Sequence, residues 1–388
     1  METLTERLLF TARASKDGDE ISRIINIQID YLPQSLLILF VVAILAALFK
    51  WPRKDPTSVG EYICHGSSVS KREYEEVVNG FLSDISFQAP DLKLDMGLKT
   101  RVENSLESHG ISRGLIDQIG MCISTATKIT CCAFPFVSHE AKEAIALYAS
   151  YVITIDDLTS DILPDLENYV TQLILRQSHQ HELLRGFTNF LGTQGELFGQ
   201  FGGDMIVKGS MEFVSAAVIE QRRDKQLRLP PEASDYLVFF RAKTGVAEPF
   251  AFFCFPEDTN PEDRDLAGYI AAIPSIMLFL GYVNDLLSFY KEERKAGDCP
   301  GFIQAHAKLH GFTSFQSLYQ LRNETIKEVQ KVRSILSKNA LMAEHINQFI
   351  HGYIFYHLCS ERYKLDDLNI PAAVKARSRF QEMRKVRR

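Results

Sequence analysis

The sequence predicts an all-α protein built around one helical bundle. Apolar residues recur with helical periodicity from Arg72 to about Leu368, and no convincing alternation of apolar and polar residues predicts a strand. The stretch Leu266–Val283 is almost wholly apolar, as expected for a helix at the centre of a large bundle. The chain has 388 residues, of which 46% are hydrophobic and 24% charged, so it can form a large buried core.

The residues before the bundle divide into a polar segment (1–30), an apolar segment (31–49) and a linker (50–71). The apolar segment is uninterrupted from Leu36 to Phe49, and its full length from Tyr31 just suffices to cross a bilayer. We therefore expect a single-pass transmembrane helix. The uninterrupted part alone is also compatible with a buried core helix or with the apolar part of a signal peptide.

Charges beside the apolar segment favour a cytosolic location for the bundle. Lys50, Arg53, Lys54 and the interfacial aromatic Trp51 follow this segment directly. A cleaved signal peptide fits less well, because the first 30 residues carry six acids against four bases. Two alternatives stay open. Basic residues before the apolar segment weaken the prediction of which side of the membrane the bundle faces. If the N-terminal residues come from a faulty gene model, the protein would be cytosolic.

The bundle itself is expected to contain about ten helices. The eighth has the clearest start, because Asn260 is a capping residue type, Pro261 suits the first helical position, and Glu262 and Asp263 place acids in the first turn. This helix could be mistaken for a second membrane span, but we favour a core helix. The expected helices are Arg72–Ile85, Leu98–Glu107, Arg113–Cys131, His139–Asp157, Pro164–Gln180, Met205–Arg223, Pro230–Phe240, Pro261–Lys295, Ser314–Ser337 and Leu341–Tyr363.

The end of the chain is expected to be a basic tail, residues 369–388, that follows the bundle domain of residues 72–368. Asp366-Asp367 precedes Pro371 and is expected to mark the end of the last helix. The tail is expected to be solvated, with anionic lipid as an alternative contact. The net charge of −6 gives no overall basic field, so we expect no nucleic-acid partner. Seven scattered cysteines indicate reduced thiols rather than a disulfide framework.

Two polar clusters lie inside apolar helical sequence. Asp156-Asp157 and, a few residues on, Asp161 end one helix. Asn284, Ser288 and Glu292 lie at i, i+4 and i+8 on another, which keeps them within roughly 80° of arc on one face. Oxygen donors without sulfur or imidazole suit Mg²⁺, which is usually held by a few protein oxygens together with substrate phosphates. The two clusters therefore predict a magnesium site for a phosphorylated ligand, although a solvated helix end and a local hydrogen-bonded ladder are simpler explanations for each cluster alone.

These motifs, with a third segment from Phe349 to Leu365 that contains Arg362-Tyr363, resemble the class I terpene cyclases of the fungal trichodiene synthase-like group. The resemblance covers roughly Arg72 to Leu368. It implies the class I terpenoid synthase helical bundle around an apolar pocket and a cluster of Mg²⁺ ions, three in number. It also implies an isoprenoid diphosphate substrate, most often farnesyl diphosphate. A homodimer is an open alternative to a monomer.

The resemblance assigns roles to residues of this chain. Asp156 would be the principal metal ligand and catalytic residue on the first helix, while Asn284, Ser288 and Glu292 would chelate another ion. Asp161 is a further candidate metal ligand, although it lies one place later than in the common Asp-Asp-x-x-Asp form. The expected donors to the substrate diphosphate are Arg241, Lys291, Arg362 and Tyr363.

The expected reaction is ionisation of an allylic C–O bond, followed by cyclisation of the carbocation to a sesquiterpene with release of diphosphate. Aromatic faces can stabilise such a cation. A chain-elongating prenyltransferase is an alternative, but it would normally carry a second Asp-Asp-x-x-Asp in place of Asn284 to Glu292. A non-catalytic membrane-anchored helical scaffold is another alternative, and it has no need of aligned metal ligands. The aromatic candidates are Tyr148, Tyr151, Phe279, Phe355 and Tyr356.

One further spacing gives a weak zinc prediction. His306 and His310 lie at i, i+4, but the glutamate of a metalloprotease motif is missing between them. His179 and His181 point to different helical faces, and we expect them to lie in a solvated turn.

Overall fold

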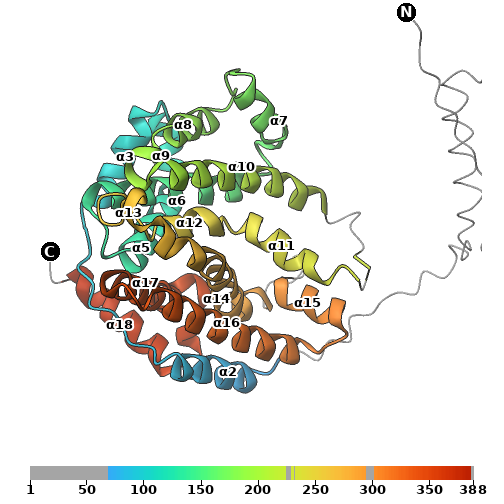
Figure 1. Cartoon of the computed structure of the whole chain (residues 1–388). Helices are drawn as coiled ribbons and strands as arrows, with labels where there is room; N and C mark the ends of the chain where they lie inside the picture. Colours follow the sequence, from blue (N-terminus) through green and yellow to red (C-terminus); the bar gives the residue numbers. More distant parts are fainter. Residues whose placement is uncertain (1–68, 224–228, 231, 294–300, 386–388) are drawn as a thin grey trace, which may run out of the picture. The chain divides into compact units, whose positions relative to one another are not determined.

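The computed structural model describes residues 69–223, 229–230, 232–293 and 301–385. The chain divides into two units, Met1–Cys64 and His65–Arg388, and the described residues all belong to the second. The predicted polar segment, the transmembrane helix and nearly all of the linker therefore lie outside the described residues. Every regular element in the described part of the chain is a helix, which confirms the predicted fold class (Figure 1).

The described part of the chain is built from successive helices. In order they are α2 (Lys71–Asp84), α3 (Leu98–Ser108), α4 (Arg113–Gln118), α5 (Gly120–Ala133), α6 (His139–Leu158), α7 (Leu163–Ile174), α8 (Glu182–Leu191), α9 (Gln194–Phe198), α10 (Gln200–Arg223), α11 (Ser234–Thr244), α12 (Ala247–Phe252), α13 (Glu262–Tyr269), η1 (Ile270–Ala272), α14 (Ile273–Glu293), α15 (Phe302–His310), α16 (Ser314–Leu336), α17 (Ala340–Cys359), η2 (Glu361–Tyr363), η3 (Leu365–Asp367) and α18 (Pro371–Lys385).

Local capping explains several of the boundaries. Ser70 starts α2 with a capping box, in which its hydroxyl accepts from the Glu73 amide while the Glu73 carboxylate accepts from the Ser70 amide. Thr313 and Gln316 make the same arrangement at α16, and the Asn339 side chain caps α17. These residues satisfy backbone donors that a helix start leaves without intrahelical partners. The sequence placed these three starts to within two residues.

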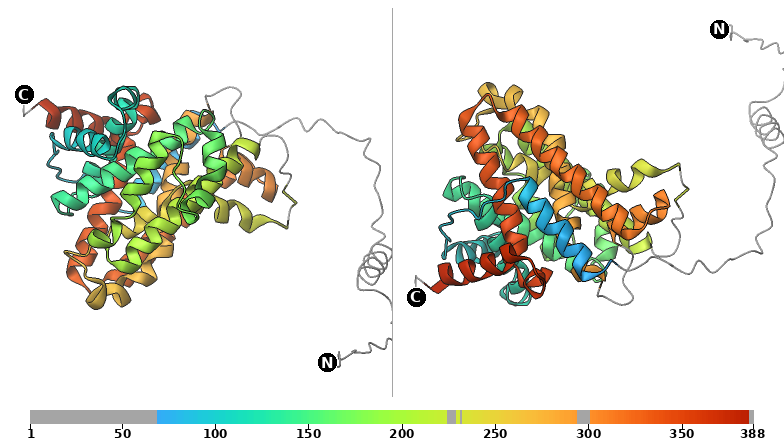
Figure 2. Two further views of the ribbon diagram at one scale, coloured as in Figure 1. Left: turned by 90° about the horizontal axis from the view of Figure 1, so that it is seen from above. Right: turned by 90° about the horizontal axis from the view of Figure 1, so that it is seen from below.

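Helix α14 is the central element of the predicted core. It packs against α12, α16 and α17, and its residues Val283, Leu286 and Leu287 are fully buried. Among the described residues, only Glu262–Glu293 is long and apolar enough to cross a membrane by length and composition. Its packing agrees with the interpretation as a core helix. Figure 2 shows α2 lying along α16 on the outside of the bundle.

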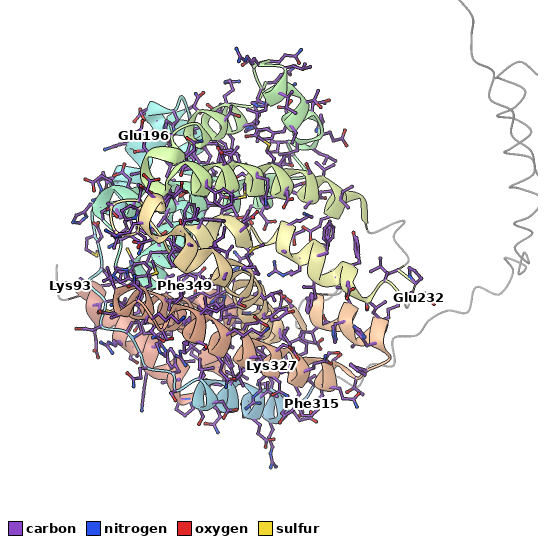
Figure 3. All side chains as sticks on the ribbon, in the orientation of Figure 1. Lys93, Glu196, Glu232, Phe315, Lys327 and Phe349 are labelled. Carbon is purple, nitrogen blue, oxygen red and sulfur yellow. The ribbon has the colours of Figure 1, made fainter. Side chains whose placement is uncertain are left out.

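The core and the surface separate as the sequence pattern requires. Phe349 of α17 is fully buried and its ring packs on Phe134, at 5.2 Å between centroids, whereas Lys327 of α16 projects into solvent (Figure 3). The backbones of α5 and α17 approach closely at Gly352. A Cβ at this position would lie only 2.0 Å from the Cys132 carbonyl oxygen. Only glycine allows this contact.

Several predicted boundaries are wrong. The segment Arg113–Cys131 breaks at Ile119, and the segment Leu341–Tyr363 ends at Cys359 before the separate η2. Asn260 does not cap α13; the Glu257 carboxylate accepts the Glu262 amide at 3.0 Å instead, because the loop before α13 folds back onto the helix start.

The expectation that Asp366-Asp367 ends the last helix is also wrong. Residues 371–385, which we expected to belong to a basic tail, form α18 and pack against α17. Pro371 begins this helix, since a proline without an amide hydrogen is tolerated in the first turn. The helices that the sequence analysis missed are α8, α9, α12, α15 and α18.

Candidate active site

A cavity of about 490 Å³ opens between α5, α6, α10, α11, α12, α14, α15, α17 and η2. One part of its wall is apolar and includes Val152, Phe213, Phe240, Phe250 and Leu280. The other part is polar and combines carboxylates with cationic and amide groups: Asp156, Asp157, Glu220, Arg241, Asn284, Asp285, Glu292 and Arg362. The two predicted clusters therefore meet at one cavity.

The first cluster reaches the cavity with two of its three acids. Asp156 and Asp157 stand in the last turn of α6 and line the cavity, and the Cys122 thiol donates to Asp157 Oδ2 at 3.3 Å. Asp161 lies in the turn after α6, is exposed, and does not line the cavity. The helix ends at Leu158, so the extra residue in the spacing carries Asp161 away from the face that Asp156 occupies.

The pKa of Asp156 depends on burial and on nearby charges. Its carboxylate is open to the cavity, yet the surrounding walls desolvate it and raise its pKa, and the neighbouring Asp157 adds to the rise. Arg362, Arg241 and Lys291 oppose the rise in the pKa of Asp156. Three of the four predicted diphosphate donors therefore interact electrostatically with Asp156.

The second cluster forms the predicted stripe along α14. The Ser288 hydroxyl, which is buried, donates to Glu292 Oε1 at 2.6 Å. Asn284 Oδ1 accepts from Arg241 Nη2 at 3.1 Å. The next residue, Asp285, is buried, and its carboxylate accepts a hydrogen bond from Arg241 Nε. Burial raises the pKa of Asp285 to about 6, although the Arg241 guanidinium opposes this rise.

The donor set fits a hard divalent cation. Asp156, Asn284 and Glu292 line the cavity, whereas Ser288 does not line it and contacts Glu292. Together the four residues offer only oxygen ligands. No group of three or more His, Cys, Asp or Glu side chains suited to a metal occurs among the described residues. This leaves the predicted mixture of amide, hydroxyl and carboxylate as the metal-binding candidate. His306 and His310 lie 4.3 Å apart between ring centroids without a third such ligand, so zinc gains no support.

The predicted diphosphate donors surround the same polar wall. Arg362 and Tyr363 of η2 and Arg241 of α11 line the cavity. Lys291 does not line it, but its Nζ lies 5.8 Å from the centre of the Tyr363 ring. Burial raises the pKa of Tyr363, so its hydroxyl remains a hydrogen-bond donor at neutral pH.

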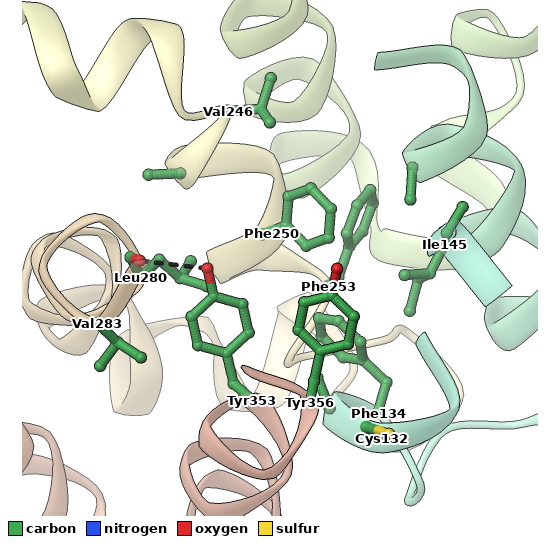
Figure 4. Close-up of a cluster of buried hydrophobic side chains, with 14 of the residues drawn as sticks. Cys132, Phe134, Ile145, Val246, Phe250, Phe253, Leu280, Val283, Tyr353 and Tyr356 are labelled. Atoms are coloured by element: carbon green, nitrogen blue, oxygen red, sulfur yellow. Dashed lines mark hydrogen bonds between the residues drawn. The ribbon is translucent and has the colours of Figure 1, made fainter. Parts of the chain in front are cut away.

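The aromatic wall differs from the prediction. Of the five predicted aromatic candidates only Tyr356 lines the cavity, whereas Tyr148, Tyr151, Phe279 and Phe355 are fully buried in the packed core. The aromatic residues that do line the cavity, besides Tyr356, are Phe213, Phe240, Phe250, Phe302, Tyr353 and Tyr363. Figure 4 shows Phe250, Tyr353 and Tyr356 together, with the Tyr353 hydroxyl donating to the Leu280 carbonyl at 3.2 Å.

Two further features, one at the cavity wall and one in the core beside Asn284, were not predicted from the sequence. Val246, between α11 and α12, lines the cavity in a left-handed backbone conformation with φ of 46°, which is strained for a β-branched residue. His357 was noticed only as part of the third segment; it is fully buried and contacts Asn284. The predicted solvated turn at His179 is also wrong, because His179 is buried and stacks on Tyr169.

This bundle, with an apolar cavity whose rim carries aligned oxygen donors and cationic groups, defines a class I terpene synthase. The chain belongs to the trichodiene synthase family: the family model described as trichodiene synthase (TRI5) matches residues 116–384. It is thus an enzyme, a carbon–oxygen lyase of the terpene synthase class. The family match includes α18 and so extends beyond the expected domain end at residue 368.

Curated relatives agree with this assignment. An (E)-beta farnesene synthase from Metarhizium brunneum is 32% identical over 310 residues, which cover 80% of this chain and 94% of the relative. Terpene synthase BipA from Cochliobolus sativus is 32% identical over 240 residues, 61% of this chain and 72% of the relative. A trichodiene synthase from Fusarium pseudograminearum is 25% identical over 233 residues, 60% of this chain and 61% of the relative.

Solved structures share the fold. A linalool/nerolidol synthase from Streptomyces clavuligerus superimposes with a TM-score of 0.52 at 13% identity, covering 70% of this chain and 99% of that chain. An α-eudesmol synthase gives the same TM-score at 12% identity, covering 71% and 99%. At such low identity these matches support the fold alone.

Proposed function

We propose that this enzyme is a Mg²⁺-dependent sesquiterpene cyclase that ionises farnesyl diphosphate. The observation that carries the proposal is the alignment of Asn284, Ser288 and Glu292 along one face of α14, with Ser288 and Glu292 already 2.6 Å apart. A cavity of about 490 Å³ lies within the ~300–1,000 Å³ typical of small-molecule sites. The names of the farnesene and trichodiene synthase relatives favour a farnesyl substrate.

The residues of the chain have distinct tasks in this proposal. Arg241, Arg362 and Tyr363 donate hydrogen bonds to the diphosphate and stabilise its charge as the allylic C–O bond breaks and the electron pair leaves with the oxygen. Asp156, Asn284, Ser288 and Glu292 would hold Mg²⁺, which when bound would supply Lewis-acid stabilisation of the same leaving group. The apolar wall excludes water and holds the carbocation, which closes a ring and then loses a proton.

The direct test is incubation of the full chain with farnesyl diphosphate and Mg²⁺, followed by gas chromatography and mass spectrometry of the volatile products. Geranyl and geranylgeranyl diphosphates are compared in parallel, because another relative, 28% identical over 296 residues, is named monoterpene synthase 25. We expect a cyclic sesquiterpene that disappears with a chelator and in a Glu292→Gln variant. Absence of any Mg²⁺-dependent product from all three substrates would refute the proposal.

We further propose that residues 31–49 anchor the enzyme as a single transmembrane helix, with the catalytic bundle in the cytosol. The support is the apolar length and the Lys50, Arg53 and Lys54 cluster that follows it. Carbonate extraction of native membranes tests this anchor, since release into the supernatant would exclude a true span. The alternative between a monomer and a homodimer also stays open, and sedimentation equilibrium would decide it.

A further inference from the structure

The side chain of His357 joins two elements that come from distant parts of the sequence. It stands in the last turns of α17, is fully buried, and packs between the rings of Tyr353 and Tyr363, each 4.6 Å away between centroids. On the other side it faces Asn284 of α14.

The hydrogen-bond partners of His357 fix its tautomer. Its Nδ1 lies 2.8 Å from the Tyr353 carbonyl oxygen, which can only accept, so Nδ1 must carry the proton. In the neutral ring Nε2 is then a bare acceptor. Nε2 lies 3.3 Å from Asn284 Nδ2, which can only donate. The histidine therefore accepts from the amide nitrogen of Asn284.

An independent contact gives the same orientation of the Asn284 amide. Arg241 Nη2 lies 3.1 Å from Asn284 Oδ1, and a guanidinium has donors only, so the atom facing it must be the amide oxygen. A carbonyl oxygen has two lone pairs, which leaves one available after the Arg241 contact. A flipped amide would place two donors together at Arg241 and two acceptors together at His357.

We propose that His357 is a positioning residue that holds the Asn284 carboxamide with its oxygen, rather than its nitrogen, available to a divalent cation. This inference rests on the proposed metal role of Asn284. Arg241 contacts the oxygen end of the amide and His357 the nitrogen end, so the two contacts together oppose a flip, and the nitrogen end cannot ligate a cation. Partners of this kind, which orient the metal ligands, typically change metal affinity by about 10- to 100-fold when removed.

The test measures binding of Mn²⁺, a spectroscopic substitute for Mg²⁺, to the full chain with inorganic diphosphate by electron paramagnetic resonance. His357→Phe keeps the ring but removes the acceptor, and we expect its Mn²⁺ affinity to fall by about tenfold. His357→Gln retains an acceptor near the position of Nε2 and should largely restore binding. The matched control is His345→Phe, three turns earlier on the same helix, where the ring stacks on Phe136 and does not line the cavity.

A second pair keeps the test decisive should His357→Phe fail to fold. His357→Gln and His357→Asn are both polar, but the shorter Asn side chain cannot place an acceptor next to Asn284. Binding should therefore be tighter in the Gln variant than in the Asn variant. In an Asn284→Asp background, which has no amide to orient, exchange of Gln for Asn at 357 should have no effect.

Each result separates the two proposals. Wild-type protein that binds no Mn²⁺ with diphosphate would overturn the proposed metal dependence and, with it, this inference. If the wild-type protein binds Mn²⁺, two results would overturn the inference alone. One is a folded His357→Phe variant with the Mn²⁺ affinity of the wild type, and the other is equal Mn²⁺ affinity of the His357→Gln and His357→Asn variants. A loss of thermal stability without a change in Mn²⁺ affinity would assign His357 a purely structural role.

Discussion

Arg241 on α11 donates its Nε–H to both carboxylate oxygens of Asp285 on α14, at 2.9 and 3.1 Å. Asp285 is buried, so this contact pairs a buried carboxylate with a guanidinium at the cavity wall. The same guanidinium also donates to Asn284. A proposed diphosphate donor is thus held by the helix that carries the proposed metal ligands.

The first prediction concerns this ion pair. Arg241→Met should lower the free energy of unfolding by about 3 kcal/mol, because it leaves the buried Asp285 carboxylate without a partner. The double variant Arg241→Met/Asp285→Asn should recover much of that loss, since no buried charge remains. Urea denaturation measures both. The control is Arg72→Met, which removes an exposed i,i+4 pair with Glu76 and should change stability little. A double variant no more stable than Arg241→Met would contradict the prediction.

The second prediction concerns the contact between α5 and α17. Gly352→Ala should destabilise the bundle by more than about 3 kcal/mol, because its Cβ would collide with the Cys132 backbone and the two helices must separate. Gly114→Ala in α4 is the matched control: its Cβ would meet open space, and alanine should stabilise this helix by about 0.5–1 kcal/mol. Thermal unfolding of the two variants should therefore shift in opposite directions.

The third prediction concerns the strained backbone at Val246. Val246→Gly removes a buried side chain but relieves a left-handed conformation that costs about 1–3 kcal/mol for a branched residue. Val214→Gly in α10 loses a fully buried side chain of the same type without such relief. We expect Val246→Gly to lower the free energy of unfolding, measured by urea denaturation, by at least about 1 kcal/mol less than Val214→Gly does. Equal losses would mean that Val246 stores no strain.

The fourth prediction separates the cavity wall from the core. Phe250→Leu removes an aromatic face that lines the cavity, and cation–π stabilisation of up to ~2 kcal/mol would be lost with it. We expect slower turnover and more acyclic or early-quenched product. Phe279→Leu alters a fully buried ring outside the cavity and should change stability while leaving the product distribution intact. Gas chromatography of the products distinguishes the two variants. A larger change in product distribution for Phe279→Leu than for Phe250→Leu would refute the placement of Phe250 at the substrate and of Phe279 in the core.

The fifth prediction is a pH dependence of stability. Burial lowers the pKa of His306 to about 4, and His310 contributes further to the lowering. The unfolded chain therefore binds this proton at higher pH than the folded chain, so stability falls as pH drops from about 6.5 toward 4. His306→Phe should remove about 1 kcal/mol of the acid-induced loss at pH 5, a value reduced for partial solvent access. The variant measured at pH 7.5 is the control, and an unchanged pH profile would exclude His306 as the cause.

The accuracy of the sequence-based prediction depended on the length of each helix. The long periodic segment Ser314–Ser337 was placed to within one residue, because many apolar positions define the buried face. The start of α10 was placed five residues late, and the predicted helix Pro261–Lys295 is divided into α13, η1 and α14. Short helices such as α9 and α12 were missed, since five or six residues contain too few turns for a period to emerge. Helix α18 was missed because it is mostly exposed and carries no strong apolar stripe.

The stripe of Asn284, Ser288 and Glu292 on α14 follows from the sequence alone, because the geometry of a single helix fixes the angular position of its residues. The contacts between helices depend on how the bundle packs: Arg241 with Asp285, His357 with Asn284, and the set of aromatic rings that face the cavity. The physical reason is that a buried ring in the core and a ring at the cavity wall produce the same apolar pattern. The packing of neighbouring helices decides which ring meets the substrate.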